Sequence, residues 1–407
     1  MKTNNPIAIA LCMAVAVLEG FDIQAMGVAM PRLGPEFGLD ADAKGWLFSV
    51  NNIGMVLGAA VGGWLADRTG RRPVLLCAVA LFGLFTFWVS IAKSYEALVA
   101  ARFLAGLGFG AALPNMMAIA AELSSPTRRA FTASMVFCGL PIGGGTVALL
   151  TQVFPTDLDW RTWFIIGGVL PWVLLPGLRW LLPETLERAT REEVRVRTPV
   201  FEALFGGGRM LPTLLLWLAF LPTLLILYLM LNWLPTLVVA KGLDRAVAPQ
   251  ASLAFNWASV AGALLIGWLV DRVGPRWPLT LSYAGLIVSL VALGATQDHA
   301  MIIAYSGIAG FLLLGANYAL YGVAPSYYPA AMRGTGSGAS VGVGRVGSIL
   351  GPLAAGFMLS GGQTAVDVVQ YMAPVAAVAG IAVFALSFFK MSNGDIPDLQ
   401  QSGRASI

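Results

Sequence analysis

The sequence predicts an all-α polytopic membrane protein in which twelve transmembrane helices form two pseudo-symmetric six-helix bundles. Three observations lead to this fold class: the composition, a series of long apolar runs, and a motif that recurs at a fixed distance. Of the 407 residues, 57% are hydrophobic and only 11% are charged. A soluble domain carries about 25% charged residues, and the mean hydropathy of +0.77 also indicates a chain that lies mostly in lipid.

Each predicted span is an apolar run long enough to cross roughly 30 Å of hydrocarbon, which takes about 20 helical residues. The twelve runs cover residues 7–31, 45–66, 73–92, 95–121, 130–153, 162–182, 210–239, 251–270, 277–296, 300–323, 335–360 and 367–390. Residues 183–209 form the one long polar stretch between runs, and we interpret them as a cytoplasmic linker. The predicted domains are an N-terminal six-helix bundle (1–182), this linker, and a C-terminal six-helix bundle with a short cytoplasmic tail (210–407).

Lysine and arginine are distributed unevenly among the loops. With the N-terminus inside, 17 of the 25 basic residues fall in inner segments, 6 in outer segments and 2 within spans. The positive-inside rule therefore predicts a multi-pass membrane protein with both termini in the cytoplasm. We expect the membrane to be a bacterial inner membrane. The same loops account for the net charge of +4, so we expect no nucleic-acid partner.

A ten-residue motif ends the second span and recurs after the eighth. It reads GWLADRTGRR at residues 63–72 and GWLVDRVGPR at residues 267–276, an offset of 204 residues. Two halves in parallel order are typical of transporters built from internal repeats. We interpret these loops, and the arginines that open later spans at the same offset, as gating elements. The gating residues are Asp67, Arg68, Arg72, Arg129, Asp271, Arg272 and Arg333.

This motif resembles the loop signature of the major facilitator superfamily, and the resemblance extends over all twelve spans. The segment Arg102–Gly110, an arginine followed by spaced glycines, resembles that family's fourth-span signature. The resemblance implies two six-helix bundles around a central cavity and transport by alternating access.

Two acids, Glu19 and Asp22, lie three positions apart in the first span, on one face of a helix. Ionisable groups at membrane depth are costly and usually functional. At ~1.5 Å per residue, Glu19 lies roughly 18 Å above Ile7, near the midplane. Arg345 lies at a similar depth in the eleventh span. We expect Asp22 to pair with Arg102, or Glu19 with Arg345.

These four charges suggest a mechanism. Two buried acids and two buried arginines cancel, so an entering carboxylate would leave one negative charge uncompensated. Protonation of one acid removes that charge, and burial already disfavours the charged form of a carboxyl group. We therefore assign proton coupling to Asp22 and Glu19, with Arg102 tuning Asp22, and the substrate carboxylate to Arg345. The structural alternative is a buried ion-pair network that only orients helices.

Other polar and aromatic side chains within the spans suit a planar, hydroxylated substrate, because rings give flat walls and amides bind hydroxyl groups. No cofactor or metal is expected, since the three cysteines and one histidine have no ligand spacing. Besides Arg345, the predicted substrate-binding residues are Asn51, Asn115, Tyr228, Asn232, Trp233, Asn256, Asn317, Tyr318 and Tyr321.

The segment Glu19–Asp22 resembles the Asp-Gly-Phe/Tyr-Asp signature of the aromatic acid:proton symporter family. Within that family, Leu113–Asn115, Cys138–Gly143, Asn232–Pro235 and Gly344–Gly347 are similar to the 3-(3-hydroxyphenyl)propionate transporters. The resemblance implies proton-coupled import of an aromatic monocarboxylate, such as a hydroxyphenylpropionate or a hydroxybenzoate. Because the first acid of the signature is Glu here, we expect Asp22 to be the main proton carrier.

Two other classes of protein remain possible at this stage. One is a proton-coupled drug or metabolite exporter of the same superfamily. The other is a membrane sensor, which usually carries a soluble output domain. An enzyme is not expected, because no nucleophile–histidine arrangement is present. The expected partners are the aromatic carboxylate, the proton and the lipid bilayer, and the protein is expected to be a monomer.

Overall fold

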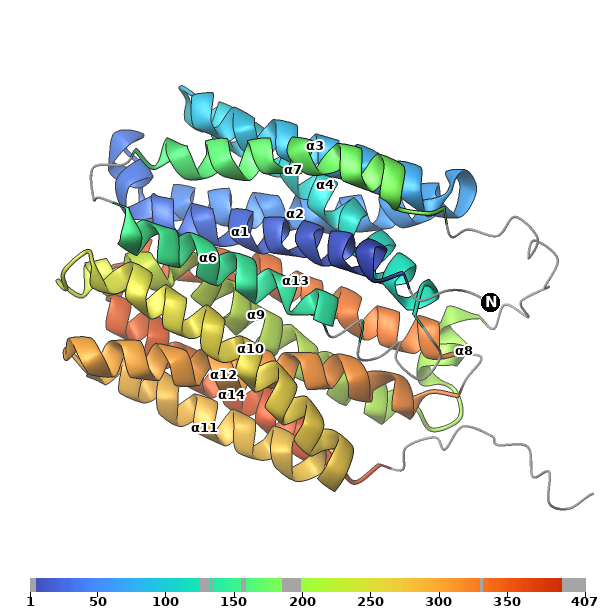
Figure 1. Cartoon of the computed structure of the whole chain (residues 1–407). Coiled ribbons are helices and arrows are strands. Elements are labelled where there is room, and N and C mark those ends of the chain that lie inside the picture. The colour runs from blue at the N-terminus through green and yellow to red at the C-terminus, as the bar shows by residue number, and fades with distance from the viewer. Residues whose placement is uncertain are drawn as a thin grey trace, which may run out of the picture.

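The computed structural model describes residues 5–124, 132, 135–154, 159–184, 199–329 and 332–389, and its regular elements are helices (Figure 1). The first half contains α1 (Pro6–Glu36), α2 (Ala41–Thr69), α3 (Arg71–Ile91), α4 (Tyr95–Glu122), α6 (Gly139–Val153) and α7 (Arg161–Leu181). The second half contains α9 (Met210–Ala240), α10 (Val247–Val273), α11 (Arg276–Ala295), α12 (His299–Val323), α13 (Arg333–Ser360) and α14 (Ala365–Leu386). Two short elements, α8 (Val200–Phe205) and the 3₁₀ turn η3 (Ala324–Tyr327), lie outside these sets.

Twelve helices of the described chain are long and apolar enough to cross a membrane, and each overlaps one predicted run. The prediction of twelve spans is therefore confirmed. The first helix continues five residues beyond its predicted end at Pro31 and contains both Pro31 and Pro35. Proline removes one hydrogen bond from the helix, but neighbouring helices support the backbone of a membrane helix at such a position. Most of the predicted linker (185–198) and the tail from residue 390 lie outside the described residues.

The helices gather into two bundles, as Figure 1 shows. In the first half α2 packs against α4, α1 against α6, and α3 against both α4 and α7. In the second half the corresponding pairs are α10 with α12, α9 with α13, and α11 with both α12 and α14. The bundles meet through three helix pairs: α2 with α13, α1 with α9, and α6 with α10.

The internal repeat extends to the way helices approach each other. A Cβ atom on Gly58 of α2 would overlap the backbone oxygen of Leu107 in α4. The equivalent residues 204 positions later repeat this contact, since a Cβ on Gly262 of α10 would overlap the oxygen of Phe311 in α12. Small residues let membrane helices approach closely enough for backbone packing. Both halves therefore use glycine at the same contact.

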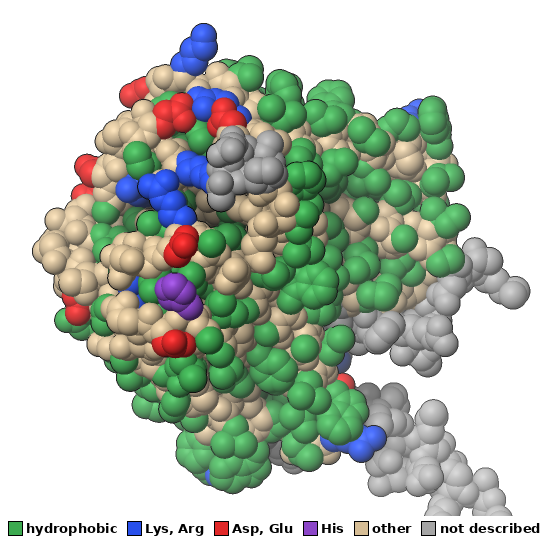
Figure 2. Space-filling model, turned by 60° about the vertical axis from the view of Figure 1, so that its left-hand side comes forward, with side chains coloured by type: hydrophobic (Ala, Val, Ile, Leu, Met, Phe, Trp, Pro, Cys, Tyr) green, Lys and Arg blue, Asp and Glu red, His purple; other side chains and the backbone are tan. Residues whose placement is uncertain are grey.

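The two ends of the molecule differ in charge. The two copies of the repeated motif lie at one end, here called the arginine-rich end, where the Arg68 guanidinium lies 3.9 Å from the Trp64 ring centroid. Arg272 repeats this stacking 4.5 Å from Trp268. Figure 2 looks towards the opposite end, where charged side chains gather, whereas the flank of the molecule shows mostly hydrophobic and uncharged side chains. This distribution suits a protein whose flank contacts lipid.

We predict that Gly58→Ala and Gly262→Ala each lower thermal stability in detergent, because the added methyl group forces two helix backbones apart. Overpacking of this kind costs roughly 1–3 kcal/mol. The matched controls are Gly63→Ala and Gly267→Ala, which also differ by 204 positions but whose added Cβ would meet nothing within 4 Å. Equal melting temperatures for the tight and open pairs would contradict this packing.

Candidate functional site

A small cavity of about 60 Å³ lies between the two bundles near the middle of the spans. Among the described residues, no group of three His, Cys, Asp or Glu side chains is placed to hold a metal ion. The cavity is mostly apolar, with one charged side chain, Arg345, and several amides and phenols. Its lining is Gly20, Ile23, Leu113, Phe137, Leu140, Pro141, Leu224, Leu227, Tyr228, Leu231, Asn256, Leu314, Asn317, Tyr318, Tyr321 and Arg345.

Arg345 is the cationic group of this cavity. It projects from α13, and its Nη1 atom donates a hydrogen bond of 2.9 Å to the Tyr228 hydroxyl on α9. Its charge also interacts electrostatically with Glu19 of α1, across the interface between the bundles. The remaining guanidinium N–H groups make it a suitable partner for a carboxylate, which a guanidinium can bind through two parallel hydrogen bonds.

Glu19 lies on the N-terminal bundle beside this cavity and is fully buried. Neither of its carboxylate oxygens has a hydrogen-bond partner among the described residues. An ionised carboxylate that is buried without a donor is unfavourable by several kcal/mol. Glu19 therefore either carries a proton or depends on the Arg345 charge for compensation.

Asp22 is held very differently, although it lies only one turn further along α1. Its Oδ2 atom forms an ion pair of 2.5 Å with Arg102 Nη1 of α4, and its Oδ1 atom accepts a hydrogen bond of 2.9 Å from Thr86 of α3. All three side chains are buried. The structure thus contains the pairing of Asp22 with Arg102, while Glu19 and Arg345 interact electrostatically without a direct hydrogen bond.

We predict that Arg102→Gln and Asp22→Asn each destabilise the protein, because each leaves one buried charge without its partner. Breaking a buried pair typically costs about 3–5 kcal/mol. The double variant, Asp22→Asn with Arg102→Gln, removes both charges and is expected to recover most of the melting temperature. A double variant less stable than either single variant would contradict an isolated pair.

Six of the predicted substrate-binding residues line the central cavity. All six come from the C-terminal bundle: Tyr228, Asn256, Asn317, Tyr318, Tyr321 and Arg345. Asn256 also donates a hydrogen bond of 3.0 Å to the side-chain oxygen of Gln24, which joins α10 to α1. This amide therefore links the bundles as well as facing the cavity.

The other four predicted substrate-binding residues do not line the cavity: Asn51, Asn115, Asn232 and Trp233. The amides of Asn115 and Asn232 donate to carbonyls four residues earlier in their own helices, at 2.8 and 2.7 Å. The Trp233 indole donates to the Pro352 carbonyl at 3.0 Å. Depth along a helix does not decide which face a residue occupies, and the N–H groups of these three side chains find partners within the bundles. The Asn51 amide nitrogen lies 3.8 Å from the Met55 sulfur, and the Asn51 side-chain oxygen is buried without a partner among the described residues.

Phe137 is a cavity residue that the sequence analysis did not single out. Its ring centroid lies 5.7 Å from those of Tyr318 and Tyr321, and the Tyr318 hydroxyl donates to the Phe137 carbonyl at 3.2 Å. Phe137 lies near the start of its span, between the cavity and the arginine-rich end. These contacts bridge the two bundles. Nothing in the sequence distinguishes a cavity-lining phenylalanine from the others within an apolar run. The sequence likewise carries no signal that Thr86 contacts Asp22.

Six of the seven predicted gating residues lie at the arginine-rich end. Asp67 and Asp271 are exposed, and no ion pair holds either acid in the part of the chain that the structure describes. Arg129 lies outside the described residues. The assignment of Asp67, Asp271 and Arg129 to gating stays a prediction.

Two other members of the gating set contact nearby backbone or carboxylate groups. The backbone N–H of Arg72 donates to Glu184 at 3.2 Å, so a carboxylate that follows α7 caps the start of α3. The Arg333 Nε atom donates to the Tyr328 carbonyl at 3.2 Å, at the start of α13. The first contact fixes the start of α3 within the N-terminal bundle, and the second fixes the start of α13 within the C-terminal bundle.

Twelve spans in two bundles, with a partly polar cavity between them, define a polytopic membrane transporter. The chain belongs to the Major Facilitator Superfamily, whose family model matches residues 12–253 and 241–403. It is therefore a transporter and not an enzyme.

Several curated transporters are similar to the chain over nearly its whole length. The 3-(3-hydroxy-phenyl)propionate transporter of Escherichia coli is 40% identical over 95% of this chain and 97% of its own. The gallate transporter of Pseudomonas putida is 33% identical over 88% and 87%. The 4-hydroxybenzoate transporter PcaK of Pseudomonas aeruginosa is 33% identical over 92% and 91%.

Solved structures share the fold at low sequence identity. A bacterial homologue of the human lysosomal transporter Spinster matches with a TM-score of 0.77 at 17% identity, over 95% of this chain and 98% of its own. The xylose transporter XylE of Escherichia coli matches with a TM-score of 0.74 at 15% identity, over 95% and 97%. These likenesses concern the fold alone.

Proposed function

We propose that this protein is a proton-coupled symporter that imports an aromatic monocarboxylate, such as a hydroxyphenylpropionate or hydroxybenzoate, by alternating access. The similar curated transporters are named for hydroxylated aromatic acids, which supports the substrate class. The basic loops support an orientation in the bacterial inner membrane with both termini in the cytoplasm. The proposal also includes a monomer, with bundles over residues 1–182 and 210–407 joined by a cytoplasmic linker.

In this proposal Arg345 binds the substrate carboxylate, assisted by its hydrogen-bonded neighbour Tyr228. The rings of Tyr318 and Tyr321 and the leucines of the cavity form walls for the aromatic ring, and Asn317 is available to a ring hydroxyl. The oxygen of Asn317 is buried without a partner among the described residues, so a hydroxyl donor would satisfy it.

The observation that carries the proposal is the buried, unpartnered carboxylate of Glu19 near the Arg345 charge. In the empty carrier, ionised Glu19 and Arg345 compensate each other. When the substrate carboxylate binds Arg345, a proton on Glu19 keeps the site neutral. Either ligand alone leaves a net charge between the bundles, where uncompensated charge is costly. Only the empty and the doubly loaded carrier therefore reorient readily.

The geometry favours Glu19 over Asp22 as the proton carrier, which reverses the preference based on the sequence. Asp22 already has a cation and a hydroxyl donor in Arg102 and Thr86, so protonation would break existing contacts. Glu19 has no hydrogen bond to lose among the described residues. We assign Asp22 and Arg102 the role of a fixed pair that orients α1 against α4.

The central cavity must widen to take its substrate. Ligand pockets usually measure about 300–1,000 Å³, whereas this cavity holds about 60 Å³. Phe137 is well placed to act as a gate on the arginine-rich side, because its contacts with Tyr318 and Tyr321 cross from one bundle to the other. Movement of this ring would open a path towards the cytoplasm in the proposed orientation.

We predict that Glu19→Gln abolishes accumulation of substrate against a gradient but retains exchange of internal for external substrate. The glutamine mimics protonated glutamate, so the loaded carrier stays neutral while the empty carrier cannot return. Uptake of a radiolabelled aromatic acid into proteoliposomes, with and without unlabelled acid inside, separates the two modes. If the variant still concentrates substrate when a proton gradient is applied, Glu19 is not the coupling residue.

We also predict that Arg345→Lys raises the half-saturation concentration about tenfold, because a point charge replaces a bidentate fork. The maximal rate should change less, since the positive charge is kept. Arg179→Lys is the matched control, because Arg179 is exposed on α7 and is not among the cavity residues. Unchanged affinity in Arg345→Lys would move the carboxylate site elsewhere.

A proton-coupled exporter would behave differently in cells. Addition of substrate to lightly buffered, de-energised cells should make the medium more alkaline if substrate and proton enter together. Acidification of the medium would instead favour the exporter and contradict the proposed direction of transport.

A further inference from the structure

The interface between α2 and α13 joins the two bundles, and it is tightly packed towards the end opposite to the arginine-rich end. A Cβ atom on Gly45, near the start of α2, would lie 2.9 Å from the Pro352 oxygen of α13. A Cβ on Gly356, near the end of α13, would lie 2.6 Å from the Ala41 oxygen of α2. These spaces are too small for a side chain, so the two helix backbones are in direct contact at this end.

The same two helices separate towards the arginine-rich end. Gly338 and Gly342 lie on the same face of α13 as Arg345 and Pro352, because successive members of this set are three, four or seven residues apart. An added Cβ on Gly338 or Gly342 would meet no atom of the described residues within 4 Å. On α2, Val56 is 37% exposed. The contact between α2 and α13 is therefore closest at the opposite end.

Asn52 joins α2 to α13 through a side-chain hydrogen bond. Its Nδ2 atom donates to the Ser348 carbonyl oxygen at 2.8 Å, and both residues are buried. In a regular helix the N–H group four residues later would donate to this carbonyl, but residue 352 is a proline and has no N–H. Asn52 therefore supplies, from the other bundle, the donor that Pro352 lacks. One turn earlier in α2, Ser49 Oγ donates to the Ile349 carbonyl at 2.8 Å.

The internal repeat places a second asparagine in the corresponding position of the other interface. Asn256 of α10 lies 204 positions after Asn52, and Gly144 of α6 lies 204 positions before Ser348. A Cβ on Gly144 would lie 2.5 Å from the Asn256 side-chain oxygen. The two amides therefore occupy equivalent places, one where α2 meets α13 and one where α10 meets α6.

Only one of these two interfaces contains the proline. The residue equivalent to Pro352 is Ala148, whose N–H group can donate to the helix carbonyl in the usual way. Asn256 donates instead to the Gln24 side chain of α1 at 3.0 Å and to the Ser252 carbonyl of its own helix at 2.8 Å. The comparison indicates that Pro352, and not the asparagine alone, determines the contact between α2 and α13.

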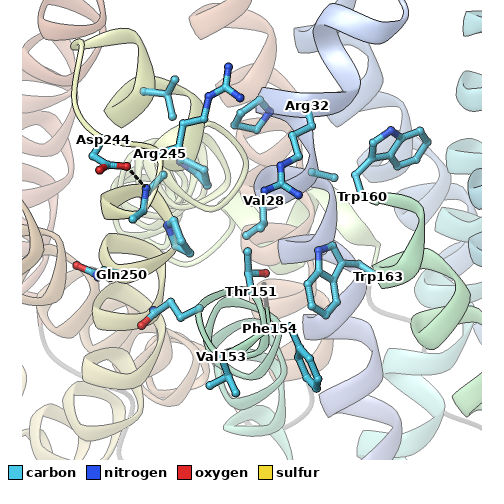
Figure 3. Close-up of a pocket in the computed structure, with 18 residues that line it drawn as sticks. Val28, Arg32, Thr151, Val153, Phe154, Trp160, Trp163, Asp244, Arg245 and Gln250 are labelled. Atoms are coloured by element: carbon cyan, nitrogen blue, oxygen red, sulfur yellow. Dashed lines mark hydrogen bonds between the residues drawn. The ribbon is translucent and has the colours of Figure 1, made fainter. Parts of the chain in front are cut away.

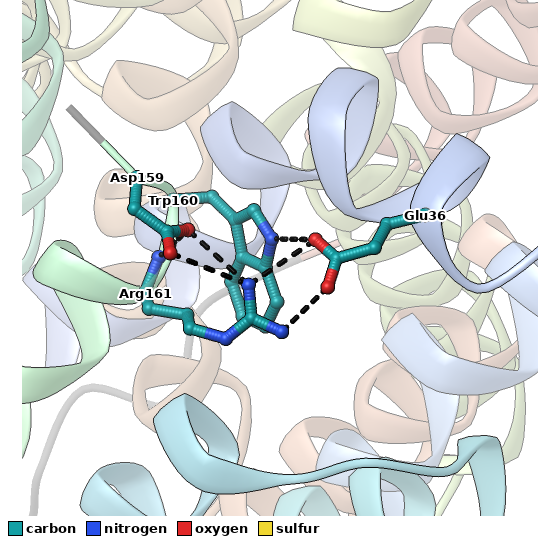
Figure 4. Close-up of polar contacts among 4 residues, drawn as sticks. All are labelled: Glu36, Asp159, Trp160 and Arg161. Atoms are coloured by element: carbon teal, nitrogen blue, oxygen red, sulfur yellow. Dashed lines mark hydrogen bonds and ion pairs between the residues drawn. The ribbon is translucent and has the colours of Figure 1, made fainter. Parts of the chain in front are cut away.

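Two other features of the opposite end do not join the bundles. A cavity of about 390 Å³ lies between them on the side of α6 and α10, where Thr151 and Gln250 are among its lining residues (Figure 3). The Glu36 carboxylate accepts hydrogen bonds from Trp160 and Arg161 at 2.6 and 2.5 Å, which fix the end of α1 to the start of α7 within the N-terminal bundle (Figure 4). Closure of this end therefore depends on the packing of α2 against α13 and of α1 against α9.

We propose that Asn52 is a positioning residue for transport: it binds the Ser348 carbonyl that Pro352 leaves free while the carrier is closed at the opposite end, and it releases this carbonyl when that end opens. This contact is here called the α2–α13 latch. Opening separates α2 from α13 and admits water, which then hydrogen-bonds the carbonyl in place of the amide. Because one neutral hydrogen bond contributes little net stability, the latch can break and re-form in each cycle. The inference rests on alternating access, and neither on the substrate nor on the proton.

The latch lies close to the proposed carboxylate site. Ser348 follows Arg345 by three residues, and its hydroxyl donates to the Arg345 carbonyl at 2.6 Å. The two sites share one turn of α13, so a shift of this helix that breaks the latch also moves Arg345.

The test measures the distance between the bundles at the opposite end by pulsed electron paramagnetic resonance. Spin labels on Lys93→Cys and Gln297→Cys, two exposed positions 204 residues apart, report on the N-terminal and C-terminal bundles. The full-length protein is studied in lipid nanodiscs after its three native cysteines are replaced by alanine: Cys12, Cys77 and Cys138. Asn52→Ala should raise the ratio of the longer-distance, open population to the closed one roughly tenfold, because it leaves a buried carbonyl without a donor.

A second background tests whether the proline is the cause. Pro352→Ala returns an N–H group to α13, so the Ser348 carbonyl gains a donor from its own helix. In this background Asn52→Ala should change the ratio of open to closed carriers less than about twofold. An equal effect of Asn52→Ala in both backgrounds would overturn the latch, as would the absence of any shift with Asn52→Ala alone.

A pair of serine variants separates the latch from a general loss of stability. Ser49→Ala removes a hydrogen bond between the bundles and should shift the ratio in the same direction as Asn52→Ala. Ser282→Ala removes a buried hydrogen bond of 2.6 Å to the Pro278 carbonyl within α11, and it should leave the ratio unchanged. Equal shifts in the two serine variants would mean that any lost hydrogen bond opens the carrier, which contradicts a specific latch.

Failure of the latch and failure of the proposed function give different results, because the distance measurement needs no substrate. If Asn52→Ala shifts the distances as expected but the wild-type protein does not accumulate aromatic acids, only the proposed substrate class is wrong. If the wild-type protein accumulates aromatic acids but Asn52→Ala leaves the distances unchanged, only the latch is wrong.

Discussion

The high energetic cost of uncompensated charge between two membrane-embedded bundles is the constraint on which the site depends. Arg345 and Glu19 belong to different bundles, and the opposite charges of the two side chains act on each other. Such a pair need not be close enough to hydrogen-bond to control which states are allowed, because two charges at a given distance interact more strongly in a medium of low dielectric constant than in water. The same physics that excludes charge from lipid thus supplies the coupling proposed between substrate and proton.

The two bundles have the same internal packing, but they contribute different side chains to the site. Glycines 204 residues apart, such as Gly58 and Gly262, make the same backbone contacts in both halves. Among the described residues, the buried acids Glu19 and Asp22 belong to the first half, and the cavity phenols come from the second. Rigid, repeated helix pairs allow each bundle to move as a unit, while the different side chains on the facing surfaces allow movement to depend on ligand and proton.

Sequence reasoning was most successful for quantities that depend on position along a helix. The positions of Asp22 and Arg102 along their spans placed them at similar depths in the membrane, and the structure contains their ion pair at 2.5 Å. Depth also suggested Asn115 and Asn232 as cavity residues, but their amides bind carbonyls of their own helices. An asparagine side chain can satisfy itself within a turn, whereas a buried charge needs a partner from elsewhere, so charged residues were the more reliable guides.

The sequence by itself determined that the chain crosses a membrane twelve times, repeats its architecture and contains four buried charges, because hydropathy, periodicity and residue identity are local properties. Only the tertiary structure decided which acid is paired and which is not. Asp22 meets Arg102 and Thr86 from two other helices, and Glu19 meets no donor in the part of the chain that the structure describes. The direction in which a side chain leaves its helix, and what lies opposite, follows from the packing of distant segments, and no spacing within α1 contains that information.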